Sequence, residues 1–255
     1  MSFPGPTAAA YDRAITMFSP EGRLYQVLYA SEAVRQGWTS LGVRTDDYVI
    51  LAAEKRRFSS FLDLDGMEKI YKIDDHIGAT FAGIGGDGRV LIDYIRLVAV
   101  RHRLVYGEPA AVEYVVRAVA DLKQAYTQHG GVRPFGVSLI VGGVDEGKTR
   151  LFRTEPGGQY FSFYAVAVGM GEETVHSLFE KKYRRDMTLE EALQLIVEAL
   201  LRVRLGSGKE KKEDILKEMH DMMEIAVIER AKPYFRKLSK EELRELVNKV
   251  APQLE

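Results

Sequence analysis

Two glycine-rich segments of this 255-residue chain have the residue spacing of phosphate-binding loops. Residues 142–149 match the loop whose backbone amides cradle phosphates, with Lys148 and Thr149 as the last two positions. That chemistry needs a helix to begin at Lys148, because the amides of a helix N-terminus bind the phosphate oxygens. Residues 150–153 instead favour a strand, and a Pro-Gly-Gly turn follows them. We therefore expect a hairpin loop here, without a bound nucleotide.

The second segment, residues 83–88, matches the glycine pattern of a dinucleotide-binding turn between a strand and a helix. The rest of a dinucleotide-binding unit is missing, because another helix follows where a strand ending in an acid is needed. A glycine-rich turn from strand to helix explains the pattern. Nucleotide binding here stays open as an alternative, which nucleotide-dependent thermal stabilisation would reveal.

Metal and thiol chemistry find little support in the composition. The chain has no Cys, which excludes disulfides, thiolate nucleophiles and Cys-ligated zinc. The five His residues are scattered, without a pair at the helical spacing of metal ligands: His76, His102, His129, His176 and His220. Adjacent Asp74 and Asp75 favour a turn over a pair of catalytic carboxylates. We expect no metal site and no cofactor.

Charge and hydropathy bound the class of protein. Lys plus Arg total 36 and Asp plus Glu total 37, which argues against a nucleic-acid partner bound through a basic face. Hydrophobic residues make up 46% of the chain, enough to build a core and to exclude a disordered protein. No apolar stretch approaches the roughly 18 residues of a membrane span, and the first ten residues lack the features of a signal peptide. We expect a cytoplasmic protein that binds no membrane.

The elements that must position any site are strands in hairpins and helices in pairs. This order favours antiparallel sheets with outer helix layers in one α+β domain, residues 1–255. The expected strands are 39–44, 48–53, 69–73, 76–82, 136–143, 149–153, 161–168, 221–230 and 234–238. The expected helices are 19–36, 88–104, 109–128, 172–184, 189–205 and 239–250, with a solvated loop at 206–212. Residues 1–12 are expected to form a flexible arm, and Ser19, Pro20 and Glu21 favour a capped start of the first helix.

Residues 11–27 contain a long specific run, Tyr-Asp-Arg-Ala-Ile-Thr-Met-Phe-Ser-Pro-Glu-Gly-Arg-Leu-Tyr-Gln-Val, and Tyr29, Ala30 and Glu32 follow it. Over this run the chain resembles the α subunits of the 20S proteasome, and the archaeal type in particular. The resemblance continues at 68–70, 73–77, 89–93, 126–128, 130–134, 136–139 and 236–239, so it covers nearly the whole chain.

The resemblance implies a four-layer α-β-β-α sandwich of the N-terminal-nucleophile hydrolase type, with an added N-terminal helix. It also implies homo-heptameric α rings stacked on rings of proteasome β subunits. In this family the α ring gates the entry of unfolded protein substrates and docks hexameric AAA ATPase activators through their C-terminal tails. The chain is therefore expected to be a non-catalytic subunit that supports ATP-dependent protein degradation.

Three groups of residues match functional positions of the family. The gate positions are Tyr11, Asp12, Arg13, Pro20 and Tyr29. The activator docking pocket is matched by Lys69, Gly83, Gly37 and Leu24. The pore loop is matched by Tyr126, Gly130, Gly131 and Arg133. By the resemblance, Lys69 receives the carboxylate at the end of an activator tail.

Each group also has a plainer structural interpretation. Pro20 and Tyr29 could start and pack the first helix, and the pore-loop residues could form an ordinary turn. Lys69 could cap a strand and pair with Glu68 or Asp74 at the surface.

Three residues and one turn depart from the family pattern, the turn at residues 85–88 being looser than the usual Ala-containing one. Leu28 stands where an acid is usual, Ser31 where the archaeal type has a basic residue, and Trp38 where a small residue is usual. The departures at Leu28 and Ser31 predict a gate that is partly open at rest.

Catalysis in the β subunits of this family uses an N-terminal Thr whose free amine is the base, oriented by an acid and a lysine. Trp38 falls at the nucleophile position, while Glu54 and Lys69 fall at the acid and lysine positions. Trp has no nucleophile, and freeing Thr39 would remove the first helix. The alternative is a hydrolase that becomes active after processing at Thr39, and the N-terminal sequence of the mature chain separates the two.

Overall fold

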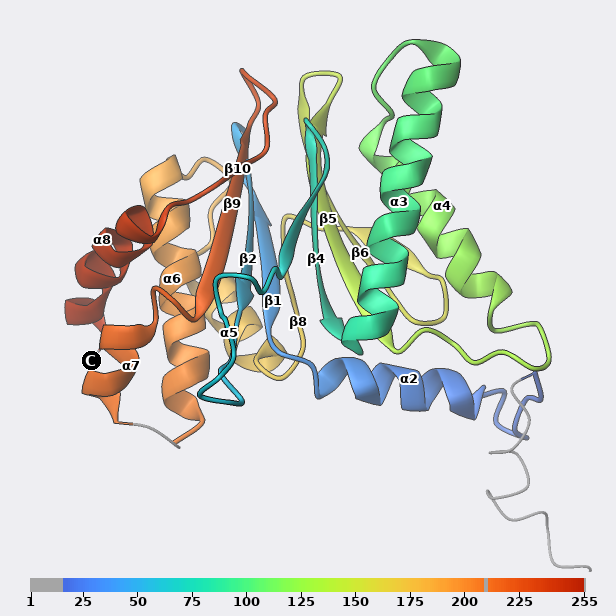
Figure 1. The fold of residues 1–255 in the computed structure, drawn as a ribbon, viewed down its shortest axis with the longest axis horizontal. Helices are drawn as coiled ribbons and strands as arrows, with labels where there is room; N and C mark the ends of the chain where they lie inside the picture. Colours follow the sequence, from blue (N-terminus) through green and yellow to red (C-terminus); the bar gives the residue numbers. More distant parts are fainter. Residues whose placement is uncertain (1–15, 209–210, 255) are drawn as a thin grey trace, which may run out of the picture.

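The computed structural model describes residues 16–208 and 211–254, whose strands form two antiparallel sheets. The first sheet has the order β10-β9-β2-β1-β8, formed by Arg236–Lys237, Met223–Glu229, Tyr48–Glu54, Ser40–Arg44 and Ala165–Val168. The second has the order β3-β4-β5-β6-β7, formed by Ile70–Asp74, Ile77–Gly83, Val137–Asp145, Lys148–Thr154 and Tyr160–Ser162. The two sheets lie face to face in the centre of the molecule (Figure 1).

The alternation of side chains along β2 shows how the sheets form a core on both faces. Val49 and Leu51 belong to the apolar cluster between the two sheets, with Ile140 of β5 opposite them. Ile50 and Ala52 point the other way, into the cluster under the outer helices. Successive side chains of a strand face opposite sides, so a strand covered on both faces is a continuous apolar run.

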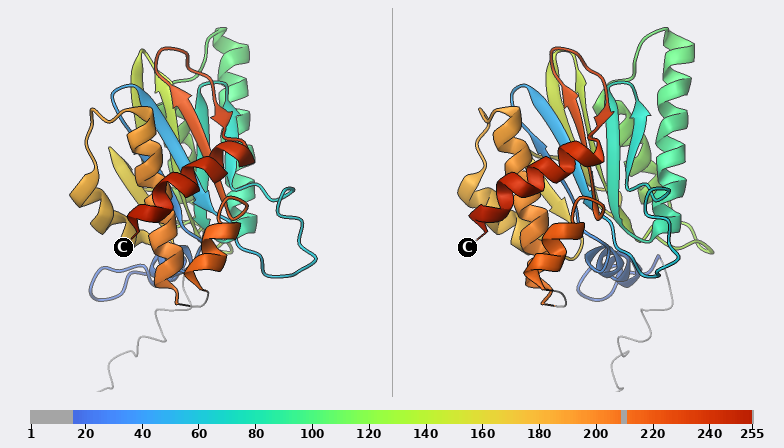
Figure 2. Two further views of the ribbon diagram at one scale, coloured as in Figure 1. Left: turned by 90° about the vertical axis from the view of Figure 1, so that its left-hand side faces the viewer. Right: turned by 60° about the vertical axis from the view of Figure 1, so that its left-hand side comes forward.

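Helices cover the outer face of each sheet. Helices α3 (Gly85–Tyr106) and α4 (Val112–Ala125) cover the second sheet. The first sheet is covered by α5 (Glu172–Lys182) and α6 (Leu189–Gly206), together with α7 (Lys212–Glu218), α8 (Lys240–Val250) and the short η1 (Ala251–Gln253). The result is a four-layer α-β-β-α sandwich, as Figures 1 and 2 show. This confirms the expected α+β fold class.

Helix α2 (Tyr25–Arg35) stands outside the four layers and crosses the lower end of the sheets in Figure 1. It begins six residues later than the expected helix 19–36, which was wrong at its start. Gly22 adopts a left-handed φ of 74°, and its N–H donates to the Ser19 carbonyl, 2.8 Å away, in a separate turn. A helix cannot continue through a left-handed residue, so Leu24 becomes the N-cap of α2.

Three other expectations are corrected in the second half of the chain. The expected strand 161–168 is two strands in different sheets, because the chain crosses from β7 to β8 at Phe163 and Tyr164. The expected loop 206–212 is shorter, since α6 extends to Gly206 and α7 begins at Lys212. The expected strand 234–238 is reduced to β10, two residues long.

The hairpin expected from the phosphate-loop pattern is confirmed. Strands β5 and β6 pair from Leu139–Thr154 to Asp145–Lys148, and Glu146 and Gly147 make the turn between them with positive φ values. No helix begins at Lys148, so the loop lacks the element that would bind nucleotide phosphates. Among the described residues, no helix combines the length and the apolar character that a membrane crossing needs.

Candidate functional site

Lys69 lies immediately before β3, with only 7% of the residue exposed. Its Nζ donates to the carbonyl oxygen of Phe81, 3.0 Å away. The same Nζ lies 4.5 Å from the centre of the Phe81 ring and 5.9 Å from that of Trp38. The ammonium group therefore has one carbonyl partner and two aromatic neighbours, which leaves hydrogen-bonding capacity for an incoming anion.

Electrostatics keep Lys69 able to carry charge despite its burial. Desolvation lowers the pKa of Lys69 to about 8, and the carboxylates of Glu54 and Glu224 oppose that shift. A lysine is charged below its pKa, so at neutral pH the group is mostly an ammonium. It can receive a carboxylate without first gaining a proton.

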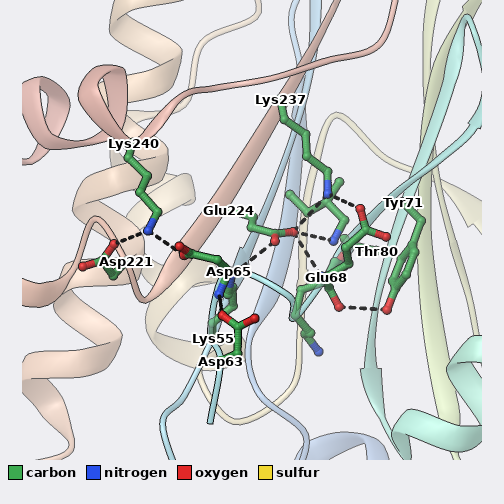
Figure 3. A network of polar contacts seen from close by, with 12 residues as sticks. Lys55, Asp63, Asp65, Glu68, Tyr71, Thr80, Asp221, Glu224, Lys237 and Lys240 are labelled. Atoms are coloured by element: carbon green, nitrogen blue, oxygen red, sulfur yellow. Dashed lines mark hydrogen bonds and ion pairs between the residues drawn. The ribbon is translucent and has the colours of Figure 1, made fainter.

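Glu224, on strand β9 of the first sheet, positions the segment that carries Lys69. Its Oε2 accepts hydrogen bonds from the backbone N–H groups of Lys69 and Ile70, both at 3.0 Å. Its other oxygen lies 3.4 Å from Lys55 Nζ, and Lys237 Nζ lies 3.6 Å from Oε2 (Figure 3). Glu224 is not among the residues predicted from sequence, although an acid inside the apolar run of β9 was a visible signal.

The loop between β2 and β3 is attached to the C-terminal elements by further ion pairs. Lys237 on β10 pairs with Glu68 at 2.9 Å, and Lys240 on α8 pairs with Asp221 at 3.1 Å and also with Asp65 (Figure 3). The expected alternative, an exposed pair of Lys69 with Glu68 or Asp74, is not found: Glu68 bonds to Lys237, and Asp74 to Arg103.

Gly37 and Gly83 meet backbone to backbone beside this lysine. A Cβ on Gly37 would lie 2.2 Å from the Gly83 amide nitrogen, and one on Gly83 would lie 2.1 Å from the Gly136 carbonyl oxygen. Gly83 also has a φ of 118°, so a larger residue is excluded at both positions.

Leu24 is the pocket residue that the fold does not bring to the others. It is the N-cap of α2, whereas Gly37 follows the other end of that helix. Eleven helical residues separate them by roughly 16 Å. Leu24 therefore lies apart from the cluster that Gly37, Gly83 and Lys69 form.

The positions that match a catalytic constellation do lie together. The Thr39 carbonyl accepts the N–H of Glu54 at 2.8 Å, and the Phe81 carbonyl accepts both Lys69 Nζ and, at 2.8 Å, Ser40 Oγ. The threonine of this constellation is not available as a nucleophile, however. Thr39 is fully buried, its hydroxyl accepts the N–H of Gly171 at 3.1 Å, and its own nitrogen belongs to the peptide bond with Trp38.

The carboxylate of buried Glu54 forms ion pairs with two arginines. Its Oε1 accepts from Arg56 Nε at 2.8 Å and lies 3.3 Å from Arg204 Nη1. The two arginines therefore neutralise the carboxylate that would orient a base.

The matched pore-loop residues follow α4 in one exposed turn. Tyr126 caps α4 and its ring lies 4.5 Å from that of Phe135, while Gly131 has a left-handed φ of 86°. Arg133 forms a two-bond pair with Asp87, at 2.7 and 2.8 Å. Asp87 also accepts the N–H of Gly136 at 2.9 Å.

Asp87 explains the glycine-rich turn at 83–88. It lies in the first turn of α3, where a carboxylate is stabilised by the helix dipole. Burial raises the pKa of Asp87, but hydrogen bonds from Arg133 and the Gly136 N–H outweigh it and keep that pKa below its usual range. A phosphate at the same helix end would meet this charge, so the geometry favours the structural turn over nucleotide binding.

The gate positions are only partly within the structure. Tyr11, Asp12 and Arg13 lie outside the described residues. Pro20 is exposed in the turn before α2, and Tyr29 is about half exposed on α2, with its ring 6.4 Å from that of Tyr25.

Two departures from the family pattern also lie on α2. Leu28 is 43% exposed, and the hydroxyl of Ser31 donates to the Val27 carbonyl at 3.0 Å. Neither offers a charge to a neighbouring chain.

Comparison with known proteins gives this arrangement a family. Residues 34–214 match the family model described as proteasome subunit, and residues 11–33 match the model of the N-terminal signature of the A-type proteasome subunit. The chain belongs to the proteasome α-subunit family. The four-layer sandwich and the helix that crosses its end are therefore those of an N-terminal-nucleophile hydrolase fold with a family-specific N-terminal extension.

Archaeal relatives, each named as the alpha subunit of the proteasome, match over most or all of the chain. The protein from Aeropyrum pernix is 55% identical over 256 aligned residues, covering 100% of this chain and 99% of the relative. The one from Sulfolobus acidocaldarius is 50% identical, covering 96% of this chain and 99% of the relative. The one from Saccharolobus solfataricus is 54% identical over 196 residues, covering 77% of this chain and 81% of the relative.

Proposed function

We propose that this chain is a non-catalytic α-ring subunit of the 20S proteasome core, and that its rings gate substrate entry and dock an ATPase activator. The observation that carries the proposal is the buried, charge-competent Lys69 beside a nucleophile position occupied by Trp38. Membership of the family supports the assembly, and the unused donors of Lys69 Nζ support a place for a tail carboxylate. We propose that the subunit acts in the cytoplasm and that the chain forms one α-type domain.

An exposed apolar stripe on α3 supports assembly. Val90, Leu97 and Leu104 recur every seven residues, and Val100 lies between them; each is 46% exposed or more. Repeats of this spacing fall on one face of a helix, and such contiguous apolar surface marks a contact with a neighbouring chain. We assign this face to the contacts between chains within homo-heptameric α rings stacked on β rings.

Docking of a hexameric AAA ATPase would place the C-terminal carboxylate of a tail on Lys69 Nζ. A charge-assisted hydrogen bond contributes about 1.5–3 kcal/mol, and several tails bound at once multiply the effect. The tail would enter between two copies of the chain, with Gly37, Gly83 and Lys69 from one copy and Leu24 from the next. The separation of roughly 16 Å between the two ends of α2 supports this assignment.

The test is Lys69→Ala in assembled particles, with Lys72→Ala as the matched control. Lys72 is three residues away, exposed and paired with Asp75 at 2.6 Å. We expect Lys69→Ala to remove ATPase-stimulated degradation of unfolded protein and to keep basal tripeptide cleavage, while Lys72→Ala keeps both. Full stimulation of the Lys69→Ala particle would refute the docking assignment.

Gating rests on the N-terminal segment. Residues 1–12 with Tyr11, Asp12 and Arg13 would obstruct the pore, and Pro20 and Tyr29 would set the direction in which they leave α2. Deleting residues 2–12 should raise degradation of unfolded protein by the particle and change tripeptide cleavage less, because a plug excludes chains more than small substrates. Equal degradation by truncated and intact particles would refute the gate.

Processing at Thr39 is the second candidate function, since Glu54, Lys69 and Ser40 do gather around that residue. A free Thr39 amine would require loss of α2, and the burial of its hydroxyl would have to be reversed. Sequencing the N-terminus of the chain from assembled particles decides between the two. An intact α2 supports the non-catalytic role, and a start at Thr39 supports the hydrolase.

A further inference from the structure

A polar cavity lies at the end of the sheets opposite α2, where the β1–β2 turn, the β5–β6 turn and the segment after α5 meet. Its volume is about 230 Å³. Five basic side chains line it, against one acid, Asp46: they are Arg44, Lys148, Arg150, Arg185 and Arg230. The cavity thus collects residues that are far apart in the sequence and mostly of one charge.

Three of these basic groups already have carboxylate partners. Arg150 pairs with Asp145 at 2.8 Å, Arg185 with Asp46 at 2.7 Å, and Arg230 with Asp47 at 2.7 Å. Arg44 and Lys148 have no ion pair with any acid of residues 16–208 and 211–254. The lining therefore keeps two positive charges that this part of the chain does not neutralise.

Arg44 is the least satisfied member of the group. Its Nη1 donates to the Thr149 carbonyl at 2.9 Å, but its Nε is buried and has no hydrogen-bond acceptor among the described residues. The guanidinium of Arg44 lies 4.5 Å from the centre of the Tyr164 ring, and that of Arg185 lies 5.2 Å from the same centre. Burial lowers the pKa of Arg44, and the nearby charges of Arg185 and Arg150 add to that effect although Tyr164 and Tyr183 oppose it.

These observations favour an anion in the cavity. Two guanidinium groups on one aromatic ring repel each other, and a shared anion between them would remove that repulsion. Guanidinium and ammonium groups are the side chains that bind tetrahedral oxyanions most strongly. The cavity is smaller than the roughly 300–1,000 Å³ of ordinary ligand pockets, which excludes a whole nucleotide and admits a single small anion.

We propose that this cavity, named here the Arg44 pocket, binds a free inorganic oxyanion of the phosphate class between Arg44 and Lys148. Arg185 and Arg230, at the rim of the pocket, add to the positive electrostatic potential that the anion meets. The site uses Gly147, Lys148 and Thr149 of the phosphate-loop pattern in a hairpin, so the anion meets side chains and not a helix end. Lys69 lies at the other end of the sheets, and the pocket is independent of the docking proposal.

The test is calorimetric titration of the assembled full-length chain with inorganic phosphate, against sodium chloride of equal ionic strength. We expect saturable binding with a dissociation constant on the order of 1 mM. Lys148→Ala should weaken it about tenfold, and the fold should survive because the exposed Lys148 side chain has no ion pair within the described chain. Lys217→Ala is the matched control, an exposed lysine on α7, and should leave binding unchanged.

Arg44→Gln gives a second, independent measurement. Gln can still donate towards the Thr149 carbonyl, and it removes the charge. If the variant melts within about 2 °C of the wild type and no longer binds phosphate, the proposal stands. Phosphate binding that equals the chloride blank, or that survives both Lys148→Ala and Arg44→Gln, overturns it.

Discussion

Lys69 and Lys123 are two buried lysines of the second sheet and its helices, and their surroundings differ. Lys123, on α4, is fully buried and its Nζ donates to the Val137 carbonyl and to Thr154 Oγ1, both at 2.8 Å. Burial lowers its pKa to about 7, where Glu155 opposes the shift and Arg153 adds to it. Lys69 keeps 7% exposure, one carbonyl partner and two carboxylates that support its charge.

The difference separates a structural lysine from one suited to a ligand. Lys123 joins α4 to two strands, and no ligand can reach it without unfolding the layer. Lys69 has unused donors, carboxylates that hold it charged and a position at the end of a strand. Burial and a lowered pKa alone therefore do not mark a functional lysine; access and spare hydrogen-bonding capacity do.

The largest expected effect is on stability, from Lys123→Ala. The variant removes a donor from two buried acceptors, of which Thr154 Oγ1 keeps the N–H of Leu139 at 3.3 Å. It also opens a cavity, and together these should cost about 2–4 kcal/mol. The apparent melting temperature should fall by about 5–12 °C. Lys69→Ala removes one donor from the Phe81 carbonyl, which keeps the hydrogen bond from Ser40 Oγ, so its melting temperature should fall by only about 2–4 °C. Differential scanning calorimetry of both variants checks this, and equal losses would remove the distinction between the two lysines.

The pH dependence of stability should sharpen the comparison. Both lysines have folded-state pKa values, about 7 and about 8, below the 10.5 of an ordinary lysine, so the unfolded chain binds more protons between those limits. Stability should therefore rise with pH from about 7 to 10.5 for Lys123, and from about 8 to 10.5 for Lys69.

Below those windows the full cost of charging each lysine is present. Lys123→Met removes that cost, so its stability relative to the wild type should be most favourable near pH 6 and decline as pH rises. Melting temperatures between about pH 6 and pH 10 measure the slope. A pH-independent difference would show that Lys123 does not titrate in this range.

A smaller effect is expected from Glu224→Gln, which removes a charge beside Lys69 and also weakens the contacts of Glu224 with Lys55 and Lys237. Gln keeps an acceptor for the N–H groups of Lys69 and Ile70 but removes a carboxylate that supports the Lys69 charge. The pKa of Lys69 should drop further, so ATPase stimulation should fall about two- to threefold at about pH 8 and little at about pH 6.5. Glu224→Ala loses the positioning bonds too, and its stimulation should fall at both pH values. Identical behaviour of the two variants would contradict the electrostatic role.

The smallest effect should come from Asp87→Asn, at the exposed end of the helix pair that contains Lys123. The Arg133 side chain is 58% exposed, and Asn keeps an acceptor for the N–H of Gly136, so the stability loss should be about 0.5–1 kcal/mol. Protein degradation should change more than tripeptide cleavage, because the loop at 126–134 would lose its tether. Unchanged degradation of both substrates would leave the pair without a role at the pore.

Much of the fold was predictable because it depends on local chemistry. The β5–β6 hairpin follows from the strand residues around Glu146 and Gly147, and the capping boxes at Thr188 and Ser239 start α6 and α8 where expected. The N-terminal run, taken together with the later matching segments, was enough for the family. These signals lie within a few residues of the structure they specify.

Long-range packing decided the rest. The strand expected at 161–168 divides between two sheets because Leu151 and Arg44, distant in sequence, bond its halves: the N–H of Phe163 donates to the Leu151 carbonyl, and the N–H of Arg44 to the Tyr164 carbonyl. Glu224 and Lys69 meet across 155 positions of chain, and Asp87 and Arg133 across 46.

Sequence alone therefore determined the family and most of the local elements, since hydrogen bonds near in the chain need no partner from elsewhere. Only the tertiary structure brought together the carboxylate that holds Lys69 in place and the cationic Arg44 pocket, because no periodicity encodes which distant side chains will share one low-dielectric site.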